Sequence, residues 1–301
     1  MAAYLADPCP LPSLSSGAAH KMVTRSPMHV WAEHPRLGAA ESDDSNASDI
    51  GTIAHDLLLG GEGRVCVIDP NEYRSKPTKD NPDGAVPIGW TNGAIRAARD
   101  EARANGLTPI LAGAMWGARQ METAARDFLD HSELAGVLDD GEGEVTMLAE
   151  VGSLGEPETW LRARPDWMNH EKKVLLHYKT SQASCAPESF IRLADGAGYF
   201  VSLAFYRRVF ERLTGKQDWL HVILAQEQNA PYACSLIGAD PAKMAIADEQ
   251  VARAISLWRE CMDRGTERRH WPAYSGRVHW ASPSAWQLAE AEMARMGDGD
   301  A

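Results

Sequence analysis

The stretch VLLHYKTS, from Val174 to Ser181, begins as an apolar run and ends in charged and polar side chains. Its first three residues are aliphatic and indicate a buried strand, and His177, Tyr178 and Lys179 follow them directly. An unpaired charge inside a protein costs several kcal/mol. The ammonium group of Lys179 therefore needs a partner near the end of this strand.

Asp166 is the candidate partner, because it lies near the end of the preceding predicted strand, in RARPDWM. The segments EVTMLAEV, TWLRARPDWM and KVLLHYK are separated by the turn-rich GSLGEPE and the polar NHEK, and they predict three consecutive antiparallel strands. Residues on adjacent strands lie within about 5 Å of each other when register and sheet face allow it. We therefore expect this acid and Lys179 to converge.

The rest of the chain alternates helical and strand periodicity. Serines at 13–16 precede a helical pattern that stops by Pro35, with a second short helix opening at Pro27 after Ser26. We expect further helices at 50–60 (capped by Ser48 and Asp49 and ended by Gly60 and Gly61), 92–104, 116–134, 198–213 and 241–264, and strands at 64–68, 221–228 and 232–239, the last two as a hairpin. This order predicts an α/β fold with a mixed central β-sheet of about five strands flanked by helices.

The composition fits one domain spanning 1–301, since 301 residues with 44% hydrophobic content can bury a full core. The N-terminal arm, about 1–12, and the C-terminal tail, about 290–301, are expected to be flexible. The five cysteines form no CxxC pair, so we expect neither an iron–sulfur cluster nor a zinc ribbon.

The charge and the hydropathy narrow the classes of function. A formal charge of −12 argues against a chain that coats nucleic acid through bulk electrostatics, although a local basic groove remains compatible with it. No apolar run reaches the 18 residues of a membrane span, and MAAYLADPCP lacks the features of a signal peptide. We expect no membrane association and a location in the cytoplasm of a bacterial host.

Several pieces of the sequence together resemble one family. They are TRSPMHVW, GTIAHDLLL, the RSKPTKD region, GEVTMLAE, RARPDWM, LLHYKTS, YFVSLAFY, AQEQNAPYA and WPAYSG. The chain resembles the PD-(D/E)XK nucleases and, within them, the RecE-like exonucleases of phages and prophages. Each piece alone is weak, but the joint order is specific and spans much of the chain. The resemblance implies a restriction-endonuclease-like core and a metal-dependent DNA nuclease.

The resemblance assigns roles to four residues. Asp166 matches the first metal-binding acid of the family and Lys179 its lysine, while His55 matches a histidine from an upstream helix and Glu144 an acid on the first strand. By this hypothesis Asp166, His177 and His55 bind the cation. Phosphodiester hydrolysis needs divalent cations such as Mg²⁺ or Mn²⁺, and the lysine would orient or deprotonate the attacking water. Plainer interpretations are a solvated strand-end lysine, a turn-capping aspartate, a core histidine and a solvent-facing glutamate.

Three positions depart from the family pattern. His177 stands where the family has a second acid, Ser202 where the following helix presents a glutamine, and Phe200 where a histidine comes just ahead of that glutamine. Tyr206, four residues after Ser202, is retained.

His177 bears on the choice of metal. A neutral imidazole binds manganese, iron, nickel or zinc but suits magnesium poorly. Either His177 is a substituted metal ligand or it packs at the strand end without metal. With Asp166 and Glu144 as the remaining anions, a magnesium site is weakened. Either the metal preference has shifted toward softer ions, or another carboxylate such as Glu150 or Glu188 has taken over, or the active site has decayed.

Tyr206, Arg164, Arg207 and Ser202 are the candidate DNA contacts. Arginine forks match phosphates bidentately, whereas a solvated helix face is the plainer interpretation for any single arginine and a core position for the tyrosine. The implied substrate is the end of double-stranded DNA, and the implied partners are a single-strand annealing protein of the RecT type and further copies of the chain. The alternative is a weakened or inactive homologue that binds DNA or a recombination partner.

Overall fold

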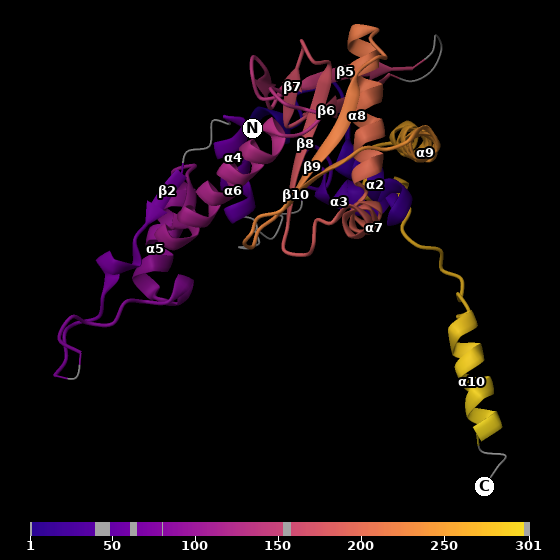
Figure 1. Ribbon diagram of the computed structural model, residues 1–301. Coiled ribbons are helices and arrows are strands. Elements are labelled where there is room, and N and C mark those ends of the chain that lie inside the picture. Colours follow the sequence, from indigo (N-terminus) through magenta and orange to yellow (C-terminus); the bar gives the residue numbers. More distant parts are fainter. Residues whose placement is uncertain (1, 40–48, 61–64, 80, 153–157, 298–301) are drawn as a thin grey trace.

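The computed structural model describes residues 2–39, 49–60, 65–79, 81–152 and 158–297 (Figure 1). The helices are α1 (Ala2–Leu5), α2 (Ser16–Thr24), α3 (Pro27–Glu33), α4 (Asp49–Leu59), α5 (Gly93–Ala104), α6 (Ala112–Asp130), α7 (Pro187–Ala197), α8 (Tyr199–Thr214), α9 (Pro241–Arg264) and α10 (Ala285–Gly297), with 3₁₀ turns η2 (Pro70–Tyr73), η3 (Gly89–Thr91) and η4 (Arg268–His270). The strands are β1 (Leu14–Ser15), β2 (Val65–Ile68), β3 (Thr108–Leu111), β4 (Glu142–Gly143), β5 (Met147–Val151), β6 (Thr159–Ala163), β7 (Trp167–Asn169), β8 (Val174–Ser181), β9 (Leu220–Glu227) and β10 (Cys234–Ile237).

A mixed five-stranded sheet in the order β10-β9-β8-β7-β4 forms the centre of the described chain. β8 is parallel to β9, with Lys179 opposite Ala225, and antiparallel to β7. A parallel neighbour requires a crossover, which α7 and α8 supply between β8 and β9. The mixed α/β fold with about five strands in its central sheet is therefore confirmed.

The alternation of side chains along β8 divides the interior into two cores. Leu175 packs into the core that includes buried residues of α2, α8 and α9, whereas Leu176 and Tyr178 pack into the core that includes residues of α4 and α6. Successive strand residues point to opposite faces, so both faces of this strand are covered. Figure 1 shows the sheet between α4 and α6 on one side and α2 and α8 on the other.

The expected three-strand meander is corrected at Pro165. Residues 159–168 do not form one strand: β6 ends at Ala163, and β7 begins at Trp167. β6 joins β5 and β1 in a separate three-stranded sheet, while β7 pairs with β8. A proline has no N–H to donate to a ladder, which suits a position where the chain leaves one sheet for another.

The N-terminal arm is also corrected. Residues 2–12 were expected to be flexible, but Asp7 and Cys9 are buried against the body. The two short helices that follow were predicted: α2 starts after Ser15, whose hydroxyl accepts from the Ala18 N–H at 3.3 Å, and α3 starts at Pro27.

The other elements that were expected lie close to their predicted positions. The helix at 241–264 and the hairpin of β9 and β10 are confirmed. α6 begins and ends four residues before the expected 116–134, and of the residues expected to bound α4, Ser48 and Gly61 lie outside the described residues. α10 projects from the body after an extended segment (Figure 1). Within the described ranges, no helix has the length and apolar character to cross a membrane.

Candidate active site

Asp166 and Lys179 meet at the edge between β7 and β8. Lys179 Nζ lies 3.0 Å from Asp166 Oδ2, and the same oxygen accepts the backbone N–H of Tyr178 at 2.8 Å. Burial alone would raise the pKa of Asp166, but the ammonium of Lys179 and the hydrogen bond and charge of His55 together outweigh this effect and hold that pKa well below its usual range. Burial would lower the pKa of Lys179, but the carboxylate raises it. The two groups form a carboxylate–ammonium pair at neutral pH.

His55, from α4, approaches the other oxygen of Asp166. Its Nε2 lies 3.5 Å from Asp166 Oδ1, and its Nδ1 lies 3.8 Å from Asp56 Oδ1. Burial alone would lower the pKa of His55, but the two carboxylates outweigh this effect and raise the pKa to about 9. The structure therefore brings His55 together with the acid–lysine pair, and as an imidazolium at neutral pH.

Glu144 lies in the loop between β4 and β5, so its expected place on a strand is corrected: that strand begins only at Met147. Its φ is +55°, and its N–H donates to the carbonyl of Asp166 at 3.0 Å. The carboxylate forms an ion pair with Arg164. Both members of this pair line the same cavity as Asp166.

His177 is packed beneath the site. It is 2% exposed, its ring stacks on Tyr206 with centroids 4.8 Å apart, and His221 lies beyond at 6.4 Å. Its buried Nε2 has no hydrogen-bond partner, and burial lowers its pKa to about 3. His177 is not among the residues that line the cavity, so its role as a metal ligand stays a prediction.

The four candidate DNA contacts separate into two pairs. Tyr206 and Arg164 line the cavity, and the Tyr206 hydroxyl accepts from Ser16 Oγ at 3.2 Å. Ser202 donates to a carbonyl of its own helix turn, and Arg207 pairs with Asp248. Neither Ser202 nor Arg207 lines the cavity.

The cavity has a volume of about 620 Å³, which is within the range that holds a small ligand or a nucleotide. Its lining combines the cations Lys179, Arg164 and His55 with the carboxylates Asp166, Asp56 and Glu144. In such a mixture the cationic side chains can bind a phosphate, and the carboxylates can bind a metal cation beside it.

A neutral polar wall of this cavity escaped the sequence interpretation. Gln228 Nε2 donates to Thr180 Oγ1 at 2.9 Å, and both residues line the cavity. A Cβ on Gly51 of α4 would lie 2.5 Å from the same hydroxyl oxygen. AQEQNAPYA was noted as a family-like segment, but only the parallel pairing of β8 and β9 shows which of its glutamines reaches the site.

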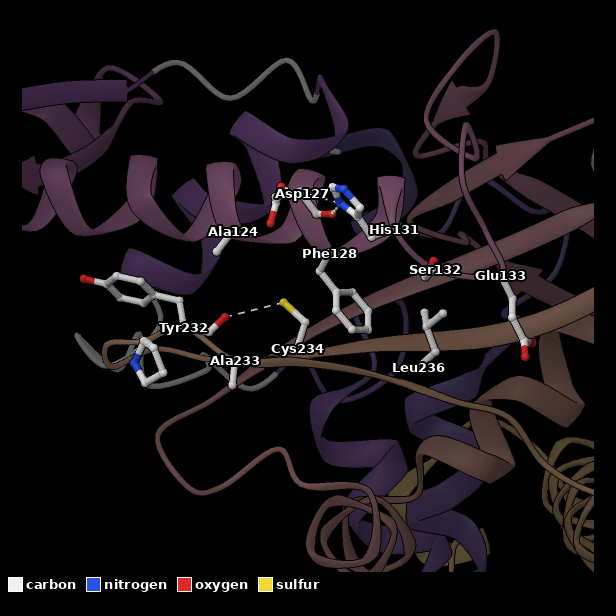
Figure 2. Close-up of a pocket in the computed structure, with 11 residues that line it drawn as sticks. Ala124, Asp127, Phe128, His131, Ser132, Glu133, Tyr232, Ala233, Cys234 and Leu236 are labelled. Carbon is white, nitrogen blue, oxygen red and sulfur yellow. Dashed lines mark hydrogen bonds and ion pairs between the residues drawn. The ribbon is translucent and has the colours of Figure 1, made fainter.

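A second cavity, of about 760 Å³, lies between α6 and the end of the β9–β10 hairpin (Figure 2). Phe128 and Leu236 border it, and the thiol of Cys234 donates to the Tyr232 carbonyl at 3.5 Å. No lysine or arginine is among its lining residues, so it lacks the cations that a phosphate site requires.

The donors for a divalent cation are present only in part. Asp166 and His55 lie together, and the His55 imidazolium must lose a proton before it can bind a metal. Across the described ranges, no group of three or more His, Cys, Asp and Glu side chains is arranged to hold a metal ion. Mg²⁺ is often held by one or two carboxylates, with waters and substrate phosphates completing its shell. The residues fit such a substrate-completed site rather than a closed cage.

A mixed sheet that presents an acid–lysine pair at adjacent strand ends defines a PDDEXK-like domain. Residues 110–282, more than half of the chain, match the family model described as a PDDEXK-like domain of unknown function (DUF3799), and the chain belongs to this family. Asp166 and Lys179 lie inside the matched range, whereas His55 precedes it. The resemblance to the PD-(D/E)XK superfamily is confirmed.

One of the solved structures that align with the chain supports the fold. The crystal structure of a candidate exonuclease from Eubacterium rectale aligns with a TM-score of 0.51 and 11% sequence identity, over 92% of this chain and 92% of that chain. At this identity the likeness shows the fold alone. The crystal structure of SSO0001 aligns with a TM-score of 0.29 and 13% identity, over 69% of this chain and 85% of that chain. No curated protein matches the sequence.

Proposed function

We propose that this protein is a metal-dependent DNA nuclease that digests double-stranded DNA from its ends. The observation that carries the proposal is the contact of 3.0 Å between Asp166 and Lys179 in a cavity that also holds Arg164. Family membership supports a nuclease, and the E. rectale structure, a candidate exonuclease of the same fold, supports an exonuclease.

The charges of the chain divide the work in this cavity. A divalent cation held by Asp166, with Glu144 and His55 beside it, would neutralise the phosphate and acidify a bound water. Because the pKa of Lys179 is raised, its side chain stays an ammonium and stabilises developing negative charge rather than removing a proton. Arg164 offers a fork that matches a phosphate.

The polar groups around the pair add orientation. Tyr206 lines the cavity with its hydroxyl held by Ser16, and the N–H of Tyr178 fixes one oxygen of Asp166. That oxygen also contacts Lys179, so the carboxylate keeps one orientation before substrate arrives. Pre-set dipoles cost no reorganisation during the reaction, which is the main benefit of such an arrangement.

A DNA-binding protein with little or no cleavage is the second candidate, and two observations favour it. The described residues include no three-donor metal cluster, and His177 replaces the second family acid while lying outside the cavity lining. This candidate retains the cationic lining and therefore the affinity for phosphate, but the carboxylates of the cavity are not arranged as a set that holds magnesium.

A nuclease assay separates the two candidates. Wild-type protein and Lys179→Ala are incubated with linear duplex DNA in Mg²⁺, in Mn²⁺ and in EDTA. Cleavage that depends on metal and disappears with Lys179→Ala supports the nuclease. Cleavage that survives the substitution contradicts the site, and salt-sensitive DNA binding without cleavage in either metal supports the binding protein.

The finer role rests on the resemblance to RecE-like exonucleases. We propose that the protein acts in phage-type homologous recombination beside a single-strand annealing protein of the RecT type, as a homo-oligomer around DNA. Co-purification with a single-strand annealing protein of the RecT type and light scattering of the purified chain test these two statements separately. A monomer without affinity for that protein contradicts both.

A further inference from the structure

Tyr4, near the very start of the chain, forms part of the candidate active site. It belongs to α1 and lines the cavity that holds Asp166 and Lys179, together with the neighbouring Leu5. Its hydroxyl donates to the carbonyl of Arg162 at 3.5 Å. Nothing in the family-like segments includes these residues, and the matched family range begins only at residue 110.

A buried anchor holds this segment in place. The carboxylate of Asp7 is fully buried; it accepts the N–H of Ser13 at 2.8 Å and its hydroxyl at 2.6 Å, and it lies 3.2 Å from the Arg162 guanidinium. The N–H of Asp7 in turn donates to the carbonyl of Tyr4 at 3.2 Å. A buried charge is costly without partners, so the contacts of Asp7 fix the position of this segment.

The surroundings of the Tyr4 ring join it to the cationic wall. The guanidinium carbons of Arg162 and Arg164 lie 5.7 and 5.9 Å from the ring centroid. Arg162 is engaged with Asp7 and Ser13, whereas Arg164 pairs with Glu144 inside the cavity. The aromatic ring therefore lies next to the arginine that is best placed for a phosphate.

The chemistry of this rim matches one part of a nucleotide. Tyr4 is partly exposed and Leu5 is 58% exposed, so an aromatic and an aliphatic side chain border a cavity that is otherwise polar and charged. A nucleotide presents an anionic phosphate with a flat, apolar base close by. Stacking on an aromatic side chain accepts any base, because every base has a π-face.

We propose that Tyr4 is a substrate-binding residue whose ring stacks on the nucleobase beside the scissile phosphate, with Leu5 extending the apolar contact. The proposal rests on the proposed function, since it takes DNA as the substrate. It adds that the contact with the base does not depend on the DNA sequence and comes from α1, outside the matched family domain.

Abasic substrates test this contact. Wild type, Tyr4→Phe and Tyr4→Ala are compared on blunt duplexes that carry one tetrahydrofuran abasic nucleotide at successive positions from the end, with kcat and KM measured in Mn²⁺ and binding measured by fluorescence anisotropy in Ca²⁺. Tyr274→Ala is the matched control, because Tyr274 is an exposed tyrosine that does not line the cavity. Urea unfolding confirms that each variant is folded.

A stacking role makes a specific set of results expected. Tyr4→Ala raises KM roughly fivefold to hundredfold on intact duplex, whereas Tyr4→Phe, which keeps the ring, raises it far less. Tyr274→Ala leaves KM unchanged. At one position the abasic nucleotide raises the wild-type KM by a similar factor and adds nothing in Tyr4→Ala. Equal KM for Tyr4→Ala and wild type, or additive losses at every position, overturns the proposal.

The two levels of inference fail differently. If wild type cleaves duplex DNA but the abasic series shows no coupling to Tyr4, only the stacking contact is overturned. If wild type binds without cleaving, the same coupling measured by anisotropy decides the stacking contact while the nuclease proposal fails. A wild type that neither binds nor cleaves overturns both.

Discussion

Lys179 Nζ and Asp166 Oδ2 lie 3.0 Å apart across two adjacent antiparallel strands, although the chain changes sheets just before Asp166. The break between β6 and β7 releases Asp166 from both ladders, so its carboxylate can turn toward the end of β8. There it meets the ammonium, a backbone N–H and the ring of His55. The question raised by a lysine at the end of an apolar strand is answered by this carboxylate.

Asp166→Asn should abolish cleavage while leaving the fold intact. The amide keeps the shape but loses the charge that binds a cation and attracts His55, so we expect activity to fall by about a hundredfold or more. The pKa of His55, raised to about 9 in the wild type, should fall in the variant. An NMR titration of the histidine C–H signals measures this shift, and Asp218→Asn, at an exposed pair with Lys173, is the control. An unchanged His55 titration contradicts the geometry.

His177→Asp should raise magnesium-supported cleavage if this position reaches the metal. His177→Asp restores the anionic ligand that magnesium prefers. His177→Asn introduces a side chain of the same size as aspartate but without a charge, and it should give no gain. Because the site is 2% exposed, we expect His177→Asp to lower the free energy of unfolding by about 1–3 kcal/mol. The ratio of rates in Mg²⁺ and Mn²⁺ is the measurement. Equal ratios in wild type and both folded variants would show that the histidine is only packed.

The stability of the metal-free protein should fall as the pH drops below 6.5. Burial lowers the pKa of His177 to about 3 and that of His221 to about 4. Below pH 6.5 these two histidines are therefore protonated in the unfolded chain but stay neutral in the native state. Each group then costs about 1.4 kcal/mol of stability per pH unit until its native pKa is reached. His55, with a raised pKa, contributes stability that is complete below 6.5 and is lost as the pH rises through about 9.

Urea unfolding in EDTA at pH 7.5, 6 and 5 measures this dependence. His221→Phe removes one of the two buried imidazoles and should make the decline less steep. A free energy of unfolding that stays level between pH 7.5 and 5 would show that these histidines are not buried in the neutral form.

Gly51→Ala should reduce activity more than stability. The new Cβ would lie 2.5 Å from Thr180 Oγ1 and 3.2 Å from Gln228 Nε2, so the start of α4 must move away from β8. His55 lies one helical turn further along α4 and would move with it. Gly113→Ala is the matched control, because nothing lies within 4 Å of its added Cβ and alanine favours a helix by up to about 1 kcal/mol. Normal kcat/KM in Gly51→Ala would contradict the close packing of α4.

The residues of β8 show how far the sequence alone could go. Aliphatic residues followed by His177 and Lys179 predicted a buried strand with a charged end at 173–179, and the structure has a strand at Val174–Ser181. The break at Pro165 was not predicted, because RARPDWM has the composition of a continuous strand and only its two different partners separate it. The direction of His177 also depends on which helix covers each face.

The positions of Gln228 and Tyr4 in the wall of the cavity could not be predicted from the sequence. Gln228 becomes a neighbour of Thr180 only through the parallel pairing of β8 with β9, which follows a crossover of two helices. Tyr4 reaches the site through the burial of Asp7, and a lone charged residue in a short segment usually signals exposure. Contacts of long sequence separation of this kind leave no local periodicity to detect.

Because the chain passes from one sheet to another at Pro165, the proposed activity depends on the packing of both sheets. Arg164 follows the last residue of β6 and Asp166 precedes the first of β7, so the directions of their side chains depend on how the two sheets pack. A slight loosening of either core would lower the proposed nuclease activity, while the circular dichroism spectrum would stay that of the native protein. Inactivation on heating should consequently precede the melting of secondary structure.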